Sequence, residues 1–93
     1  MITAGAKPRL AAKARLRFDR HSQQHMLVYP DRGMQLNPSA AAILELCDGQ
    51  RTVDAIVAAL RERAGGAREE DVRRDVEAFL SAMLERRLIQ LAP

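Results

Sequence analysis

Two histidines, His21 and His25, are four residues apart, a spacing at which a helix can present two metal ligands together. The segment between them, Ser22-Gln23-Gln24, is polar and predicts a hairpin turn. Side chains four apart on an extended chain share a face but lie about 13 Å apart. No cluster of Asp, Glu or Cys completes a metal site. We therefore interpret both histidines as solvated residues of a turn and a strand edge.

The hydroxyl and thiol groups also have structural explanations. Ser22, Ser39 and Ser81 are the serines of the chain, and they fall at a turn, a helix start and a helix surface. A Ser-His-Asp arrangement needs supporting geometry that a domain with so little interior seldom provides. Cys47 is the one cysteine, which excludes an internal disulfide and a thiolate metal cluster. Its apolar neighbours predict a small buried hydrophobic residue.

Acidic side chains gather in the first half of the third predicted helix. Paired carboxylates do catalytic work when a cleft desolvates them, whereas solvated helix charges are the commoner state. The two Gly-containing breaks of the chain are not phosphate loops, because no Lys-Ser/Thr follows either. We predict that the protein is not an enzyme and uses no metal and no cofactor. The carboxylates concerned are Glu69, Glu70, Asp71, Asp75 and Glu77.

Three short strands are predicted in the N-terminal half of the chain. Leu16-Arg17-Phe18-Asp19 alternates apolar and polar side chains, and His25 to Tyr29 is rich in residues that favour strands. Pro30-Asp31-Arg32-Gly33 contains the Pro and Gly residues that are typical of a turn. A third, very short strand follows at Met34-Gln35-Leu36.

Three helices are predicted to follow. Asn37-Pro38 offers a capping side chain and then proline at the first helical position, and Asp48-Gly49 ends this helix. Thr52 caps a second helix, and the third runs from about Glu69 to Arg86. Residues 88–91 can add a last extended segment. The order of three strands and three helices predicts an α+β domain that is winged-helix-turn-helix-like.

The 93 residues allow one domain, which we place at residues 15–91 after a flexible basic N-terminal arm at residues 1–14. Residues 1–20 hold six basic residues against one acidic residue, whereas the rest holds nine against eleven. The net charge of +3 therefore comes from the N-terminal end. No stretch approaches the roughly 20 apolar residues that span a bilayer. No apolar core of a secretory signal is present, which predicts a cytoplasmic protein without a membrane partner.

A winged-helix outline makes DNA binding the main alternative function. A helix that enters the major groove must approach phosphates. Residues 68–87 hold five arginines against six acidic residues, so this helix has a net charge of −1. The basic arm alone would grip phosphates only non-specifically. The chain also has only three aromatic residues for stacking on bases. These features favour a protein that binds no nucleic acid.

Three segments carry a resemblance to a known family, namely Arg15 to Asp19, Tyr29 to Asn37 and Ala40 to Val53, and Asp75-Val76 and Arg87-Leu88-Ile89 fit as well. Together they resemble the family of PqqD, the coenzyme PQQ synthesis protein D. The resemblance covers about residues 8–91, and its most specific part is the run from residue 43 through Asp48-Gly49 to residue 56. The polar hairpin at residues 21–25 departs from the family pattern.

The resemblance implies a function without chemistry of its own. PqqD-like proteins are peptide chaperones, the prototype of the recognition elements for ribosomally synthesised, modified peptides (RiPPs). They bind the precursor peptide of pyrroloquinoline quinone (PQQ) and present it to a radical SAM enzyme, which joins a Glu and a Tyr of the precursor. In related recognition domains, the leader peptide adds as a strand beside the third strand and lies against the third helix.

Carried onto this sequence, the resemblance implies a peptide-binding site with two sides. Strand addition draws affinity from main-chain hydrogen bonds and specificity from side-chain pockets. We expect a working monomer, although a free strand edge or exchange of the arm makes a dimer possible. The docking edge would be Gly33, Met34, Gln35 and Leu36, the opposite wall Val72, Asp75, Val76 and Phe79, and the rim Arg68, Asp71 and Arg73.

Overall fold

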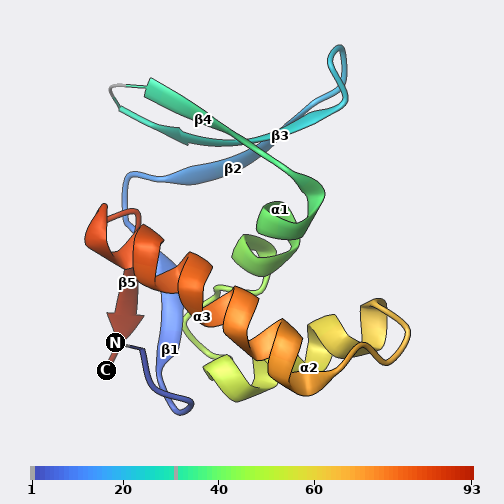
Figure 1. Cartoon of the computed structure of the whole chain (residues 1–93). Coiled ribbons are helices and arrows are strands. Elements are labelled where there is room, and N and C mark those ends of the chain that lie inside the picture. Colours follow the sequence, from blue (N-terminus) through green and yellow to red (C-terminus); the bar gives the residue numbers. More distant parts are fainter. Residues whose placement is uncertain (1, 31) are drawn as a thin grey trace.

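The structure is a computed structural model that describes residues 2–30 and 32–93. A three-stranded sheet lies across α1, and α3 runs across the molecule below it (Figure 1). The strands of this sheet are β2 (Arg15–Asp19), β3 (Gln24–Tyr29) and β4 (Arg32–Leu36). The helices are α1 (Pro38–Glu45), α2 (Val53–Arg63) and α3 (Glu69–Glu85), and a second sheet joins β1 (Lys7–Leu10) to β5 (Ile89–Ala92). The predicted α+β architecture is confirmed.

The three-stranded sheet turns one face to the helices. All its strands are antiparallel, and Leu27 of β3 pairs with Leu16 on one side and Met34 on the other. Leu27 is fully buried, whereas Leu16 and Met34 are half-buried against the core. Phe18 shares this face but is 49% exposed, because the hairpin extends beyond the helices, and its ring packs on His25 at 4.8 Å. The alternation in the sequence thus identifies the inner face correctly.

The helices begin where their capping residues predict. The Asn37 side chain accepts a hydrogen bond from the Ala40 N–H at 2.7 Å, and Pro38 occupies the first turn of α1. The Thr52 hydroxyl accepts one from the Ala55 N–H at 3.1 Å at the start of α2. Each cap satisfies a backbone donor that the first helical turn leaves without a partner. None of the helices in the described residues is long and apolar enough to cross a membrane.

The core forms where the sheet and the helices meet. Its centre holds aliphatic side chains from the sheet, every helix and β5, and the pattern of every third or fourth residue in α2 and α3 predicts which of them face inward. Removing any of the fully buried ones from a packed interior would leave a cavity. These side chains are Leu27, Leu44, Val53, Ile56, Val57, Val76, Leu80 and Ile89.

The N-terminal segment differs from the flexible arm predicted for residues 1–14. Strand β1 pairs with β5, with Lys7 opposite Ala92 and Leu10 opposite Ile89. The Ile2 and Pro8 side chains are buried. The N-terminal and C-terminal ends consequently lie next to each other (Figure 1). Local periodicity could not predict this pairing, because the two strands are about 80 residues apart in the sequence and each is only 4 residues long.

Helix α3 ends in a Schellman motif that holds a non-glycine residue in the left-handed region. The Leu88 N–H donates to the Met83 carbonyl at 2.9 Å, the Arg87 N–H donates to the Leu84 carbonyl at 3.0 Å, and Arg87 has a φ of 62°. Glycine is preferred at this position because its lack of a Cβ removes the steric cost.

We expect Arg87→Gly to stabilise the domain by about 1 kcal/mol, because glycine adopts this backbone conformation without strain. Urea unfolding of both proteins measures the difference in the free energy of unfolding. Arg87→Ala is the matched control, since it removes the charged side chain but retains the Cβ. A gain with alanine equal to the gain with glycine would contradict the backbone explanation.

Cys47 is buried next to the end of α1, as its apolar neighbours predict. Its thiol donates a hydrogen bond to the Ile43 carbonyl at 3.3 Å. Burial, with a smaller contribution from the Asp48 charge, raises the pKa of the Cys47 thiol to about 12. Since the thiolate is the nucleophile, the native protein should react with a disulfide reagent at pH 8 only as fast as it unfolds. Full reactivity in urea is the control, and a rapid reaction of the native protein would contradict this burial.

Candidate functional site

Strand β4 lies at the edge of its sheet, and the strand register determines which backbone groups it presents. Tyr29 and Arg32 pair across a connection of two residues. A pair that closes so short a connection must be hydrogen-bonded, and hydrogen-bonded pairs alternate along an antiparallel ladder. Met34 therefore bonds to β3, whereas Gly33 and Gln35 direct their N–H and C=O groups away from it. Among residues 2–30 and 32–93, no strand pairs with this outer edge.

The side chains of β4 alternate between the two faces of the sheet. Leu36 is buried and Met34 is half-buried on the face toward the helices. Gln35 is exposed on the other face, and Gly33 adds no side chain there. An extended chain laid beside β4 would thus find two open donor–acceptor pairs, with an apolar surface on the helix side.

A groove of about 400 Å³ lies between the three helices. It begins close to the end of β4, because Pro38 and Ser39 line it and follow Leu36 by two and three residues. Three of the predicted wall residues, Val72, Asp75 and Val76, line its α3 side. Its remaining lining comes from α1 and from the end of α2, at Ala42, Ile43, Leu60, Arg63 and Ala64.

The other predicted site residues of α3 lie outside this groove. Phe79 is half-buried against the core, one turn beyond Val76. The Arg68 guanidinium forms an ion pair with Glu70 at 3.1 Å, and the Asp71 carboxylate forms one with Arg74 at 2.8 Å. Arg68 and Asp71 are therefore exposed residues near the start of α3, paired with their own neighbours in sequence.

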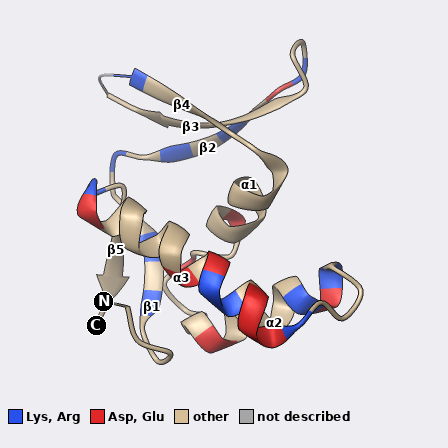
Figure 2. Cartoon of the chain, in the orientation of Figure 1, with Lys and Arg blue, Asp and Glu red and all other residues tan. Residues whose placement is uncertain are grey.

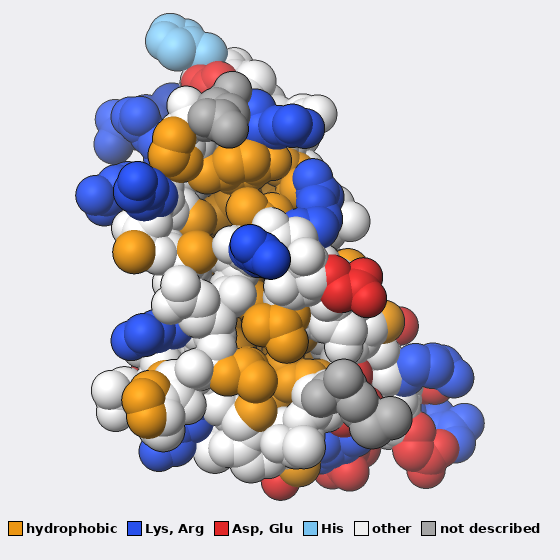
Figure 3. Space-filling model, turned by 90° about the vertical axis from the view of Figure 1, so that its left-hand side faces the viewer, with side chains coloured by type: hydrophobic (Ala, Val, Ile, Leu, Met, Phe, Trp, Pro, Cys, Tyr) orange, Lys and Arg blue, Asp and Glu red, His pale blue; other side chains and the backbone are white. Residues whose placement is uncertain are grey.

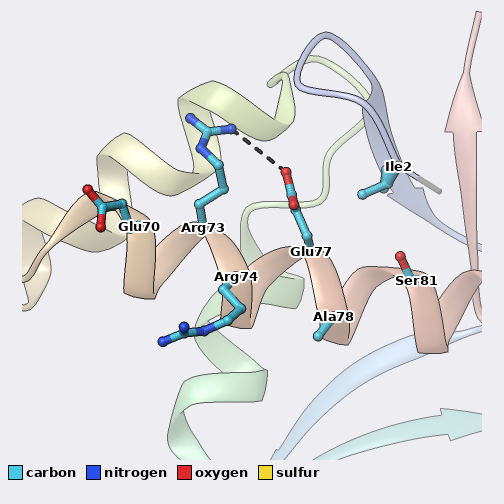
Figure 4. A pocket seen from close by; sticks show the side chains of 7 residues that line it. All are labelled: Ile2, Glu70, Arg73, Arg74, Glu77, Ala78 and Ser81. Carbon is cyan, nitrogen blue, oxygen red and sulfur yellow. Dashed lines mark ion pairs between the residues drawn. The ribbon is translucent and has the colours of Figure 1, made fainter.

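Arg73 points away from the groove and toward α2. Its guanidinium donates a hydrogen bond to the Asp54 carboxylate at 2.6 Å and lies 3.9 Å from Glu69 and from Glu77. The bond to Asp54 is the main reason why the pKa of Arg73 is raised. Figure 4 shows Arg73 and Glu77 together on this side of α3, in a second depression that Ile2 also lines. The geometry gives Arg73 a role in joining α3 to α2.

The charges on α3 also bear on the alternative of DNA binding. Acidic residues concentrate in the first half of α3, next to two more in α2 (Figure 2). Arg68, Arg73 and Arg74 in this region are each within ion-pair distance of a carboxylate. Because these arginines are already paired, the first half of α3 has little positive charge to offer to phosphates.

Two features of the site escaped the sequence reasoning. The end of α2 contributes Leu60 and Arg63 to the groove. Arg86, at the end of α3, places its Nη1 atom 3.9 Å from the Sδ atom of Met34 on β4, across 52 positions of sequence. No local sequence pattern predicts either arrangement, because both depend on how the helices pack against one another and against the sheet.

Comparison with known proteins identifies the family. The family model "Coenzyme PQQ synthesis protein D (PqqD)" matches residues 24–89. A "PqqA binding protein" of Azotobacter vinelandii is 42% identical over 84 residues, which cover 90% of this chain and 89% of that protein. A "PqqA binding protein" of Stutzerimonas stutzeri is 48% identical over 67 residues, which cover 72% of this chain and 71% of that protein.

A solved structure shows the same fold. It is the solution NMR structure of the PqqD truncation of Methylobacterium extorquens PqqCD, described as a functional and stand-alone RiPP recognition element. The two structures superpose with a TM-score of 0.81 and 30% sequence identity, over 97% of this chain and 95% of that one. The family predicted from the sequence is confirmed, and this chain belongs to the coenzyme PQQ synthesis protein D (PqqD) family.

Proposed function

We propose that this protein is a peptide chaperone of PQQ biosynthesis that binds the PqqA precursor peptide as an added strand on the outer edge of β4. The observation that carries this proposal is the pair of outward-facing backbone positions, Gly33 and Gln35, at the edge of the sheet. The family supports it, since the relatives named above are PqqA binding proteins.

The two parts of the site have different tasks in this proposal. The edge of β4 supplies main-chain hydrogen bonds, which hold an extended peptide of any sequence. The groove between the helices supplies selectivity, because the half-buried Val72 and Leu60 offer apolar surface and the exposed Asp75 offers a negative charge. Arg68 and Asp71 near the start of α3, and Phe79 one turn beyond Val76, remain proposed contacts.

The proposal includes no chemistry by this chain itself. The protein holds the peptide in the cytoplasm, where the precursor is synthesised, and presents it to a radical SAM enzyme. It works as a monomer, because a second copy paired at β4 would occupy the edge that the peptide needs. Four of the acidic side chains of α3 that could suggest catalysis are engaged on the surface with arginines, namely Glu69, Glu70, Asp71 and Glu77.

Calorimetry with the PqqA peptide tests the proposal. We expect saturable binding of one peptide per protein, and weaker or no binding of a peptide with the same composition in scrambled order. The titration is repeated with the radical SAM enzyme present, since the enzyme can add affinity. Absence of binding in both conditions would refute the proposed function.

A further inference from the structure

The geometry points to a carboxylate-binding subsite at the start of β4, formed by Tyr29, Arg32 and Arg86. This inference rests on the proposed function, because the carboxylate belongs to the peptide that docks on β4. It adds to that function a chemical requirement on the peptide, namely one acidic group at a defined place along the strand.

These three residues line one cavity of about 250 Å³. Tyr29 and Arg32 are opposite each other in the β3–β4 ladder, so their side chains leave the sheet on the same face. Arg86 approaches from the end of α3, and the buried Leu88 contributes apolar lining. Two guanidinium groups and one phenol thus surround a small space with an apolar side.

The subsite is close to the docking edge. Arg32 is itself the first residue of β4 and immediately precedes Gly33, the first position with outward-facing backbone groups. The Nη1 atom of Arg86 lies 3.9 Å from the Sδ atom of Met34, the next residue along the strand. Side chains alternate along an added strand, so every second peptide residue points to the face that carries Arg32 and Met34. One such residue would meet the cavity.

The charges of the described residues leave this site open to an anion. Six arginines elsewhere lie within ion-pair distance of an acidic residue, whereas no described carboxylate lies within 4.0 Å of Arg32 or Arg86. The paired arginines are Arg51, Arg61, Arg63, Arg68, Arg73 and Arg74. Figure 3 looks onto this end of the molecule, where Lys and Arg side chains border hydrophobic ones in the upper half.

A carboxylate is the group that this chemistry selects from a peptide. Planar guanidinium groups bind carboxylates through paired hydrogen bonds, and a phenol can donate a further one. The α3 helix ends here, and the negative end of its dipole repels an anion. Binding must then come from the guanidinium groups, which makes it sensitive to the loss of either arginine. The carboxylate is either an Asp or Glu side chain or the C-terminus of the peptide.

The test measures the dissociation constant of fluorescently labelled PqqA peptide by anisotropy. The variants are Arg32→Gln, Arg86→Gln and the double variant, and Arg17→Gln is the matched control because it is exposed on β2 and points to the opposite face. We expect the double variant to weaken binding about tenfold, which corresponds to about 1.4 kcal/mol. The control should stay within twofold of the wild type.

Altered peptides identify the source of the carboxylate and need no altered protein. Each Asp or Glu of PqqA is replaced in turn by its amide, and one peptide carries an amidated C-terminus. One of these peptides should bind the wild-type protein about tenfold more weakly than unaltered PqqA does. Its affinity should not fall further when the protein is the double variant. The inference would be overturned if the double variant bound PqqA within twofold of the wild type. It would also be overturned if none of the altered peptides showed this coupling. Absence of wild-type binding would instead refute the proposed function.

Discussion

Gln35→Pro is expected to weaken peptide binding at least tenfold and to leave the domain folded. The Gln35 N–H points away from β3, so proline removes a donor that an added strand would use while the ladder to β3 stays intact. The carbonyl of the peptide that loses this donor is left without a partner, at a cost of about 1–3 kcal/mol. The pyrrolidine ring also intrudes on the edge where the peptide must approach.

Gln35→Ala is the matched control for this prediction, because it removes the same side chain and retains the N–H. Calorimetry with the PqqA peptide compares the two variants, and the far-ultraviolet circular dichroism spectrum shows whether both remain folded. Equal affinity of the proline and alanine variants would mean that this amide does not contact the peptide. The strand-addition model would then lose its main support.

Deletion of residues 1–10 is expected to destabilise the domain by about 3 kcal/mol or more. The deletion removes the buried Ile2 and Pro8 side chains and takes from β5 its partner strand, which uncovers Ile89. Full burial of one large apolar side chain contributes about 1.5–3 kcal/mol. Because small domains have a total stability of about 5–15 kcal/mol, the shortened chain should unfold at a much lower urea concentration.

A variant with Lys7→Gln and Arg9→Gln separates charge from structure in this experiment. Both side chains are exposed, and their replacement removes the two basic charges of residues 1–10 without removing β1. This variant should keep a urea midpoint close to that of the wild type. If the deleted chain also kept that midpoint, the N-terminal segment would be a dispensable arm after all.

The fold was largely predictable because its main signals are local. Asn37 and Thr52 cap helices where they stand in the sequence, and the alternation around Leu27 assigns the inner face of the sheet. The pairing of β1 with β5 was not predictable, because it joins the two ends of the chain through strands too short to show a period. A basic segment that contains proline and shows no period is predicted to be a flexible arm unless its pairing with β5 is known.

The candidate site was predictable only in part, and for a similar reason. The family resemblance placed Val72, Asp75 and Val76 on the wall of a site, and all three line the groove. It placed Arg73 at the rim, whereas the Asp54 carboxylate on α2 draws this side chain to the other side of α3. The approach of Arg86 to Met34 depends on tertiary packing and leaves no trace in local sequence.

Amide hydrogen exchange of β4, with and without the PqqA peptide, tests the central claim most directly. In the free protein, the Met34 N–H is bonded to β3 and should exchange slowly, whereas the Gly33 and Gln35 N–H groups face outward and should exchange quickly. The account predicts that saturating peptide slows exchange at Gly33 and Gln35 and changes Met34 little. Bound peptide with unchanged fast exchange at Gly33 and Gln35 would contradict it.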